Sequence, residues 1–222
     1  MKKLALVIDF DGTITDDDFF VYVRDAYFDD KALAPWRQYL NGELTHFNAL
    51  KQIYGTLRVS EEEINRLVEK VKIDKSALEL FKYCFNNNIP VYIASAGCDY
   101  YIKRLIGNEI QKYNITLITN TSYYNKDEGL VMQSPPVDSW YYKESTGISK
   151  ASIVEYLKKN GHFVVFAGDG PPDIEPAKIA DAVFAKKILL EKCIELGIST
   201  EEFIICEQII NYIKRFSNGY YS

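Results

Sequence analysis

Short apolar runs recur along the chain, and stretches with a helical pattern lie between most of them. The apolar runs cover residues 4–8, 90–94, 115–118, 163–167 and 182–185. Runs of this kind are typical of strands buried on both faces of a parallel sheet. The helical patterns cover residues 76–86, 100–110 and 149–159. This alternation predicts an α/β fold with a doubly wound, mostly parallel sheet, whose strand ends gather on one edge.

Residues 16–75 interrupt the alternation. The aspartates at 16–18 resemble the acidic start of a helix, and Ser60 with Glu63 fits a capping box in front of a further apolar stripe. About sixty residues of helix are thus inserted directly after the first strand. Insertions placed there commonly act as lids that exclude water, although a peripheral helical decoration would show the same pattern. We therefore expect a core domain of residues 1–15 and 76–222 with a small helical cap domain of residues 16–75.

Two carboxylates leave the carboxyl end of the first predicted strand. Asp9 and Asp11 are two positions apart, so both can point toward one spot at the edge where open α/β sheets bind ligands. Gly12 follows where the chain must turn tightly, with backbone N–H groups free to approach an anion. Bare carboxylates at the end of a core strand cost stability unless a cation or hydrogen bonds compensate them. The pair therefore indicates a metal site, with an ordinary Asp-Gly turn as the alternative.

Further polar residues follow other predicted strands or begin a helix. Ser95 and Gly97 come after the second apolar run, and Asp169 and Asp173 lie in a glycine-rich loop after the run at 163–167. Each has an ordinary explanation as a helix cap or a turn residue. Lys150 opens a helical segment, where its ammonium opposes the helix dipole and so favours a nearby anion; a solvated surface lysine is the alternative.

Composition narrows the possible functions. The chain has 222 residues and a net charge of −5, which argues against broad binding of nucleic acid. No segment approaches the ~18 consecutive apolar residues of a membrane span. The scattered cysteines at 84, 98, 193 and 206 lack metal-ligand spacing and indicate reduced thiols in a cytoplasmic protein. We expect His46 and His162 to be ordinary helix-surface or strand-entry residues. The oligomeric state stays open.

In the order Asp-x-Asp, Ser, Lys, Gly-Asp-Gly-x-x-Asp, these motifs resemble those of haloacid dehalogenase superfamily phosphatases, over essentially the whole chain. The insertion after the first motif resembles the subgroup with a helical cap, as in phosphoserine phosphatase. A closer likeness is to the methionine-salvage phosphatases that act on a methylthiopentenyl enol phosphate. The shared pieces are DFDGTIT, Ser95-Ala-Gly-Cys-Asp-Tyr-Tyr, and Ala180-Asp-Ala-Val-Phe-Ala-Lys with Leu189-Leu190 and Cys193. Unlike those relatives, the chain has no cysteine in 140–149 and has Ala96-Gly97 in place of Gly-Gly.

The resemblance implies a Rossmann-like core and a role for each motif residue. Asp9 would be the nucleophile that forms an aspartyl-phosphate, and Asp11 the general acid and base. Ser95 and Lys150 would hold phosphoryl oxygens. Mg²⁺ would be held by the Asp9 carboxylate, the Asp11 backbone carbonyl and Asp169. Asp173 would support the metal site or orient Lys150, with Gly12 and Gly97 shaping the two loops.

The resemblance also implies a small phosphorylated metabolite as substrate, because a closed lid leaves little room for a protein. Cap residues that could select it are Phe19, Phe20, Arg24, Trp36, Tyr54 and Arg58, of which we favour Phe20, Arg24 and Arg58. Phosphoserine, pyridoxal phosphate and phosphocholine-type substrates remain open beside the enol phosphate.

Rival functions share part of this pattern. A signalling receiver domain also combines an acidic pocket with a lysine, but nothing like Gly168-Asp169 follows its lysine, and it lacks the insertion. A regulatory protein that has kept the fold and lost the chemistry would have the same fold. A phosphotransferase, which passes the phosphoryl group to another acceptor, would carry the same motifs as a hydrolase.

Overall fold

The computed structural model describes residues 3–217, which build a seven-stranded sheet in the order β4-β3-β2-β1-β7-β8-β9. The strands are β1 (Lys3–Ile8), β2 (Val91–Cys98), β3 (Thr116–Asn125), β4 (Gly129–Gln133), β7 (His162–Gly168), β8 (Ala182–Ala185) and β9 (Glu201–Glu202). All neighbours pair in parallel except β4, which is antiparallel to β3. The predicted α/β fold with a mostly parallel sheet is confirmed.

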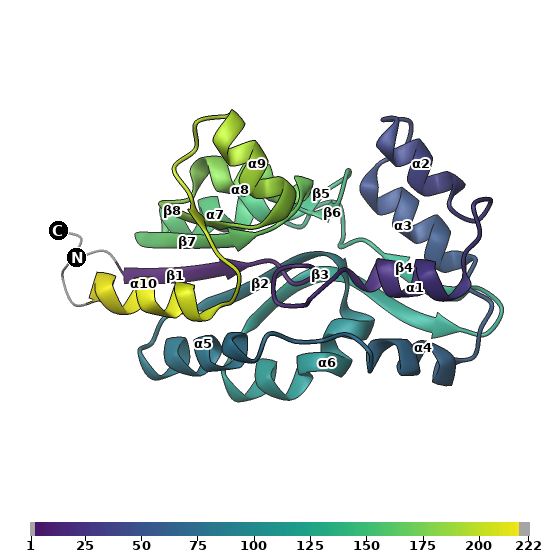
Figure 1. The fold of residues 1–222 in the computed structure, drawn as a ribbon, viewed down its shortest axis with the longest axis horizontal. Helices are drawn as coiled ribbons and strands as arrows, with labels where there is room; N and C mark the ends of the chain where they lie inside the picture. The colour runs from purple at the N-terminus through teal and green to yellow at the C-terminus, as the bar shows by residue number, and fades with distance from the viewer. Residues whose placement is uncertain (1–2, 218–222) are drawn as a thin grey trace.

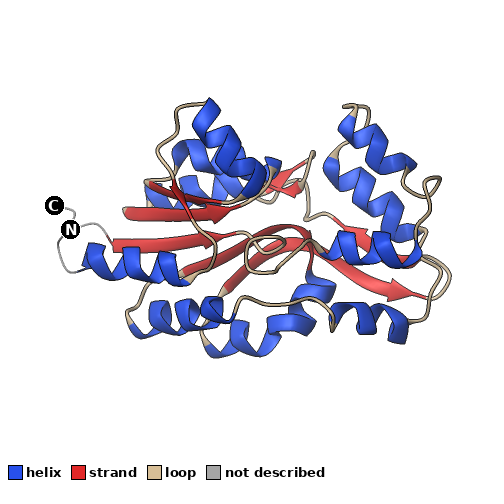
Figure 2. Ribbon diagram, in the orientation of Figure 1, coloured by secondary structure: helices blue, strands red, loops and turns tan. Residues whose placement is uncertain are grey.

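Helices cover both faces of this sheet (Figures 1 and 2). One face carries α5 (Lys75–Asn86), α6 (Asp99–Lys112) and α10 (Glu207–Ser217), and the other carries α7 (Lys150–Lys159), α8 (Ile174–Ile179) and α9 (Lys187–Glu195). Successive residues of β1 alternate between the two faces: Leu6 and Ile8 pack with the first group of helices, whereas Ala5 and Val7 pack with the second. This double burial explains why the central strand reads as a continuous apolar run.

The strands next to the site are longer than the pattern predicts. β2 continues to Cys98 and β3 to Asn125, past the predicted ends at 94 and 118. Cys98 pairs with Asn120 across a bulge, and residues 121–125 pair with β4. The separate hairpin of β5 (Tyr142–Lys143) and β6 (Gly147–Ile148), like β9, is too short to carry a detectable period.

Residues 16–75 contain α1 (Phe19–Tyr27), α2 (Ala34–Leu40), α3 (His46–Gly55) and α4 (Glu61–Val68). Ser60 and Glu63 form the predicted capping box at the start of α4. The two ends of the segment lie side by side: Asp16 N–H donates to the carbonyl of Lys72 at 3.0 Å, and Asp74 N–H donates to that of Ile14 at 2.9 Å. A segment that leaves and re-enters the core at one place has the form that a cap insertion requires, and the division at 16–75 stays a proposal.

The sequence predicts no membrane span and four reduced cysteines. Between residues 3 and 217, no helix is long and apolar enough to cross a membrane. All four cysteines, at positions 84, 98, 193 and 206, are buried free thiols, as the scattered spacing suggests.

Asp74 joins the base of the helical segment to the C-terminal part of the core. Its carboxylate caps α5 by accepting from Ser76 N–H at 2.9 Å, and it accepts from Cys206 N–H at 2.7 Å. Burial acts to raise the pKa of Asp74, but the hydrogen bonds from Ser76 and Cys206 outweigh it and lower the pKa below its ordinary value. The contribution of this carboxylate to stability is therefore present above the ordinary pKa and is lost as the pH falls through the lowered one.

Asp74→Ala should lower the free energy of unfolding at neutral pH by about 1–2 kcal/mol, the usual effect of losing a helix cap. The deficit should shrink below about pH 4, where the wild-type carboxylate becomes protonated. Urea denaturation at several pH values measures both effects, with Asp30→Ala on the exposed surface as the control. A deficit that is equal at every pH would contradict the proposed role of the charge.

Candidate active site

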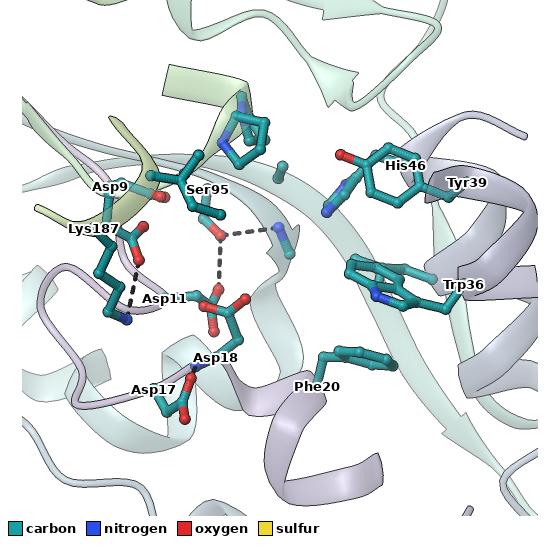
Figure 3. A pocket seen from close by; sticks show the side chains of 18 of the residues that line it. Asp9, Asp11, Asp17, Asp18, Phe20, Trp36, Tyr39, His46, Ser95 and Lys187 are labelled. Carbon is teal, nitrogen blue, oxygen red and sulfur yellow. Dashed lines mark hydrogen bonds and ion pairs between the residues drawn. The ribbon is translucent and has the colours of Figure 1, made fainter. Parts of the chain in front are cut away.

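The predicted site residues converge on one cavity of about 320 Å³ at the carboxyl edge of the sheet. Asp9 follows β1, Ser95 lies in β2, Lys150 is the first residue of α7, and Asp169 follows β7. All of them line the cavity, together with Asp11 and Gly97. Figure 3 shows Asp9, Asp11 and Ser95 facing a second group of side chains from the inserted helices.

A buried lysine connects two of the acids. The Lys150 Nζ atom lies 2.8 Å from Asp9 Oδ1 and 2.6 Å from Asp173 Oδ1. Burial alone would lower the pKa of Lys150, but the carboxylates of Asp173 and Asp9 raise it above its usual value. The other Asp173 oxygen accepts the backbone N–H groups of Asp169 and Gly170, both at 3.0 Å. Asp173 therefore holds both the lysine and the loop after β7 in place.

Asp9 has one engaged and one open carboxylate oxygen. Oδ1 accepts from Phe10 N–H at 2.7 Å and contacts Lys150, whereas Oδ2 has no hydrogen-bond partner within the described chain. Burial raises the pKa of Asp9 well above its ordinary value, and the charges of Asp173 and Asp169 add to this effect against the opposing charge of Lys150. A cation beside the open oxygen would favour the ionised, nucleophilic form.

Asp11 points toward the inserted helices. Its Oδ2 accepts the Tyr101 hydroxyl at 2.5 Å and the Ser95 hydroxyl at 3.2 Å, and its Oδ1 accepts the backbone N–H of Phe19 at 3.1 Å. Burial raises the pKa of Asp11, although the hydrogen bonds from Tyr101, Phe19 and Ser95 act in the opposite direction. The environment thus shifts the pKa of Asp11 in the direction that suits a general acid.

The two glycines permit close approaches that a side chain would block. Gly12 has a φ of +66°, and a Cβ atom there would lie 2.1 Å from Asp169 Oδ2. A Cβ atom on Gly97 would lie 1.8 Å from the Tyr101 hydroxyl and 2.9 Å from Asp11 Oδ2. The absence of a side chain at Gly12 therefore lets Asp169 approach the loop after β1. The absence of a side chain at Gly97 lets Tyr101 and Asp11 approach the end of β2.

The acids suit a hard divalent cation. Asp9, Asp169 and Asp173 can each offer one oxygen, with the three oxygens within 4.8 Å of one another. Asp173 already uses both oxygens, so Asp9 and Asp169 are the better pair of carboxylate ligands. The Asp11 side chain is turned toward Tyr101, which leaves its backbone carbonyl as the group that could bind the ion. Oxygen donors of this kind are the ligands that Mg²⁺ prefers.

Further charges line the same cavity. Lys187 Nζ lies 3.2 Å from Asp169 Oδ2, on the core side of the cavity. Asp17 and Asp18 lie in the loop that leads to α1. Burial, together with the negative charges of Asp11 and Asp169, raises the pKa of Asp18 to about 7. Lys187 thus offsets part of the negative charge that Asp17, Asp18 and Asp169 bring to the cavity.

The helical segment contributes an aromatic wall. Phe20 stacks on Trp36 with a centroid distance of 4.4 Å, and the His46 ring lies edge-on to Trp36 and Tyr39 at 5.8 and 5.3 Å. Leu40, Leu50 and Tyr54 extend this wall. His46 lines the cavity, so the prediction of an ordinary helix-surface residue is wrong. The reason is that α3 begins with its first residue turned toward the core.

The cap residues expected to select a substrate divide into two groups. Phe20, Trp36 and Tyr54 line the cavity, and Phe19 contacts Asp11 through its backbone. Arg24 and Arg58 are not among the lining residues. Arg24 is exposed and paired with Asp25 at 2.7 Å, and Arg58 donates to the carbonyl of Gly55 at 2.7 Å. Arg24 therefore ends on the surface of α1, and Arg58 ends on the surface of the loop between α3 and α4.

Several residues of the site escape the sequence pattern. Asn120 is buried, and its amide nitrogen donates to the carbonyls of Ala96 and Gly97 at 3.0 Å and of Thr146 at 3.1 Å. Asn120 thereby connects the end of β2, which carries Ser95, to the β5–β6 hairpin. No motif marks Asn120, whereas Tyr101 could have been found, since it lies in the first turn of the helix that follows Ser95 and Gly97.

Comparison with known proteins extends this picture. A family model described as haloacid dehalogenase-like hydrolase matches residues 6–178. The 2-hydroxy-3-keto-5-methylthiopentenyl-1-phosphate phosphatase of Bacillus cereus (strain ATCC 10987 / NRS 248) is 28% identical over 214 residues, 96% of this chain and 96% of that protein. The protein of the same name from Bacillus pumilus (strain SAFR-032) is 25% identical over 205 residues, 91% of this chain and 87% of that protein.

Solved structures show the same fold at lower identity. A substrate-bound phosphoserine phosphatase superposes with a TM-score of 0.69 at 20% identity, covering 96% of this chain and 99% of that chain. A phospho-aspartyl intermediate analogue of phosphoserine phosphatase gives a TM-score of 0.68 at 21% identity, with the same coverage.

Fold and site together define an α/β protein whose polar groups meet at the carboxyl edge of a mostly parallel sheet. Since the family model spans most of the chain, the protein belongs to the haloacid dehalogenase-like hydrolases. The predicted family is thereby confirmed.

Gly97→Ala should displace the Tyr101 hydroxyl and with it Asp11. A misplacement of about 1 Å at a group that takes part in the reaction costs about a hundredfold in kcat/KM. Adding Tyr101→Phe should recover part of the loss, because it removes the atom that the new Cβ would meet. Phosphate release measures the effect, with Gly107→Ala in α6 as the control, since a Cβ atom there meets nothing closer than 4.0 Å. Full activity of Gly97→Ala would contradict the need for this close approach.

Proposed function

We propose that the protein is an Mg²⁺-dependent phosphatase that hydrolyses a small phosphomonoester through an aspartyl-phosphate on Asp9. The observation that carries this proposal is the position of Asp9, which lines the cavity beside Lys150 and a cluster of carboxylates and has one oxygen without a hydrogen-bond partner among the described residues. Phosphate monoesters hydrolyse extremely slowly in water, so that positioning and charge neutralisation must supply most of the rate enhancement.

In the first half-reaction the open Asp9 oxygen attacks phosphorus, and the bond between phosphorus and the ester oxygen breaks. Asp11 gives its proton to the departing oxygen, which leaves as an alcohol or enol. Lys150 and the Ser95 hydroxyl hold phosphoryl oxygens during the transfer. Bound Mg²⁺ would supply the positive charge that lets an anionic nucleophile approach an anionic phosphate.

In the second half-reaction water replaces the alcohol. Asp11, now ionised, takes a proton from a water molecule whose oxygen attacks phosphorus. The bond between phosphorus and the Asp9 oxygen breaks, which restores the carboxylate and releases inorganic phosphate. The raised pKa of Asp11 fits both roles, because the group must be protonated in one step and basic in the next.

The aromatic wall favours a leaving group without negative charge. Phe20, Trp36 and Leu50 offer apolar contacts, and the lysines among the lining residues, Lys150 and Lys187, both belong to the core. By its printed name, the substrate of the Bacillus relatives carries a hydroxyl, a ketone and a terminal methylthio group. A thioether packs well against aromatic rings. We therefore propose this enol phosphate, or a close analogue, as the substrate.

Phosphoserine suits this wall less well. Its carboxylate would need a cation among the inserted helices, and no lysine or arginine of residues 19–68 lines the cavity. A buried carboxylate without such a partner costs several kcal/mol.

A panel of phosphomonoesters should reveal this preference. With Mg²⁺, the methylthiopentenyl enol phosphate should exceed phosphoserine in kcat/KM by at least about a hundredfold, and EDTA should abolish release from both. Pyridoxal phosphate and phosphocholine complete the panel, and added glycerol tests for transfer to an alcohol. A preference for phosphoserine would contradict the role of the aromatic wall, and glycerol phosphate as the main product would indicate a phosphotransferase.

Asp9→Asn should abolish turnover while preserving the fold, because an amide cannot form the acyl phosphate. We expect kcat to fall by at least about a thousandfold. Circular dichroism verifies folding, and incorporation of ³²P into protein trapped during turnover should be seen only with Asp9 present. Substantial turnover by a folded Asp9→Asn enzyme would show that another group is the nucleophile.

A further inference from the structure

His46 is a polar residue of the aromatic wall that stands opposite the phosphate-binding groups. It begins α3, and its imidazole lines the cavity beside Tyr39 and Trp36. Figure 3 shows the ring directed from the inserted helices toward the side where Asp9 and Ser95 lie. A backbone hydrogen bond of 3.0 Å from Phe47 N–H to the carbonyl of Ser145 ties the start of α3 to the core. The position of His46 relative to the core is therefore set.

The imidazole lacks partners in the part of the chain that the structure describes. Its Nδ1 atom is buried without a hydrogen bond, and no described residue bonds to Nε2. By contrast, the other histidine, His162, has its Nδ1 atom 3.2 Å from the carbonyl of Leu157. Since Nδ1 has almost no exposed surface, Nε2 is the nitrogen left for a ligand atom in the cavity, and a bond to it would supply a partner that the described chain does not.

The charge state of His46 limits the kind of ligand atom that can form a hydrogen bond with its imidazole. Burial lowers the pKa of His46 to about 4, and the nearby positive charge of Lys150 acts in the same direction against the weaker opposite effect of Asp173. At neutral pH the ring is uncharged and offers one N–H donor and one acceptor. Such a group can donate to a carbonyl or hydroxyl oxygen or accept from a hydroxyl, but it brings no positive charge to neutralise a carboxylate.

We propose that His46 is a specificity-determining residue that hydrogen-bonds an uncharged oxygen on the carbon next to the ester carbon. This inference rests on the proposed function. A phosphate held by Lys150 and Ser95 places the first carbons of the leaving group between these residues and His46. The wall of Trp36 and Phe20 beyond it then receives the apolar end of the substrate.

A matched pair of substrates tests the proposal: 2-oxopropyl phosphate has the oxygen, and n-propyl phosphate lacks it. The wild-type enzyme should prefer the first. His46→Phe keeps a ring of similar shape without nitrogen and should lose about tenfold in kcat/KM on 2-oxopropyl phosphate, with little change on n-propyl phosphate. His46→Gln should restore part of the preference, because its amide can also donate and accept. His162→Phe is the matched control.

A second readout does not depend on the His46 variants folding. In Asp9→Asn enzyme labelled with ¹⁵N-histidine, 2-oxopropyl phosphate should shift the His46 ring resonances more than n-propyl phosphate does, and His162 should stay unchanged. Equal shifts from both compounds, or an equal loss on both substrates in His46→Phe, would overturn the proposal. Failure of the wild-type enzyme to release phosphate from any ester would instead overturn the proposed function.

Discussion

The contact on which the site depends is the buried Lys150 ammonium between Asp9 and Asp173. Without it, several carboxylates would share one desolvated space, and burial together with mutual repulsion would favour their protonated forms. The lysine also explains the local chain geometry. A cation in the first turn of α7 opposes the helix dipole, and the two carboxylates more than compensate for this. Asp173 accepts hydrogen bonds from the backbone N–H groups of Asp169 and Gly170, and so it also fixes the loop that carries Asp169.

A second constraint couples the inserted helices to the chemistry. The segment 16–75 leaves and returns through paired backbone at Asp16 and Asp74, close to the acidic loop. The first residue of α1, Phe19, donates its N–H to Asp11, so any movement of this helix reaches the proposed acid directly. The same helices carry the aromatic wall. Substrate selection and placement of the proton donor therefore depend on one structural unit.

Much of the sheet and of the site at its edge could be predicted from the sequence. The apolar runs locate the strands because a parallel sheet buries both faces, and the polar residues after them converge because parallel strands end on one edge. The predicted helices begin within one residue of α5, α6 and α7. Boundaries are predicted less well where β2 and β3 continue into polar residues, since hydrophobic periodicity ends there while backbone pairing does not.

The sequence by itself determined the parallel sheet and the grouping of Asp9, Asp11, Ser95, Lys150 and Asp169, because both follow from local pattern and from the direction of the strands. Only the tertiary structure decided which side chains of the inserted helices face the acids. It places His46 and Tyr39 in the cavity and leaves Arg24 on the surface. The physical reason is that packing against the rest of the protein sets the rotation of each helix about its axis. Residue type alone does not show which side chains then face the cavity.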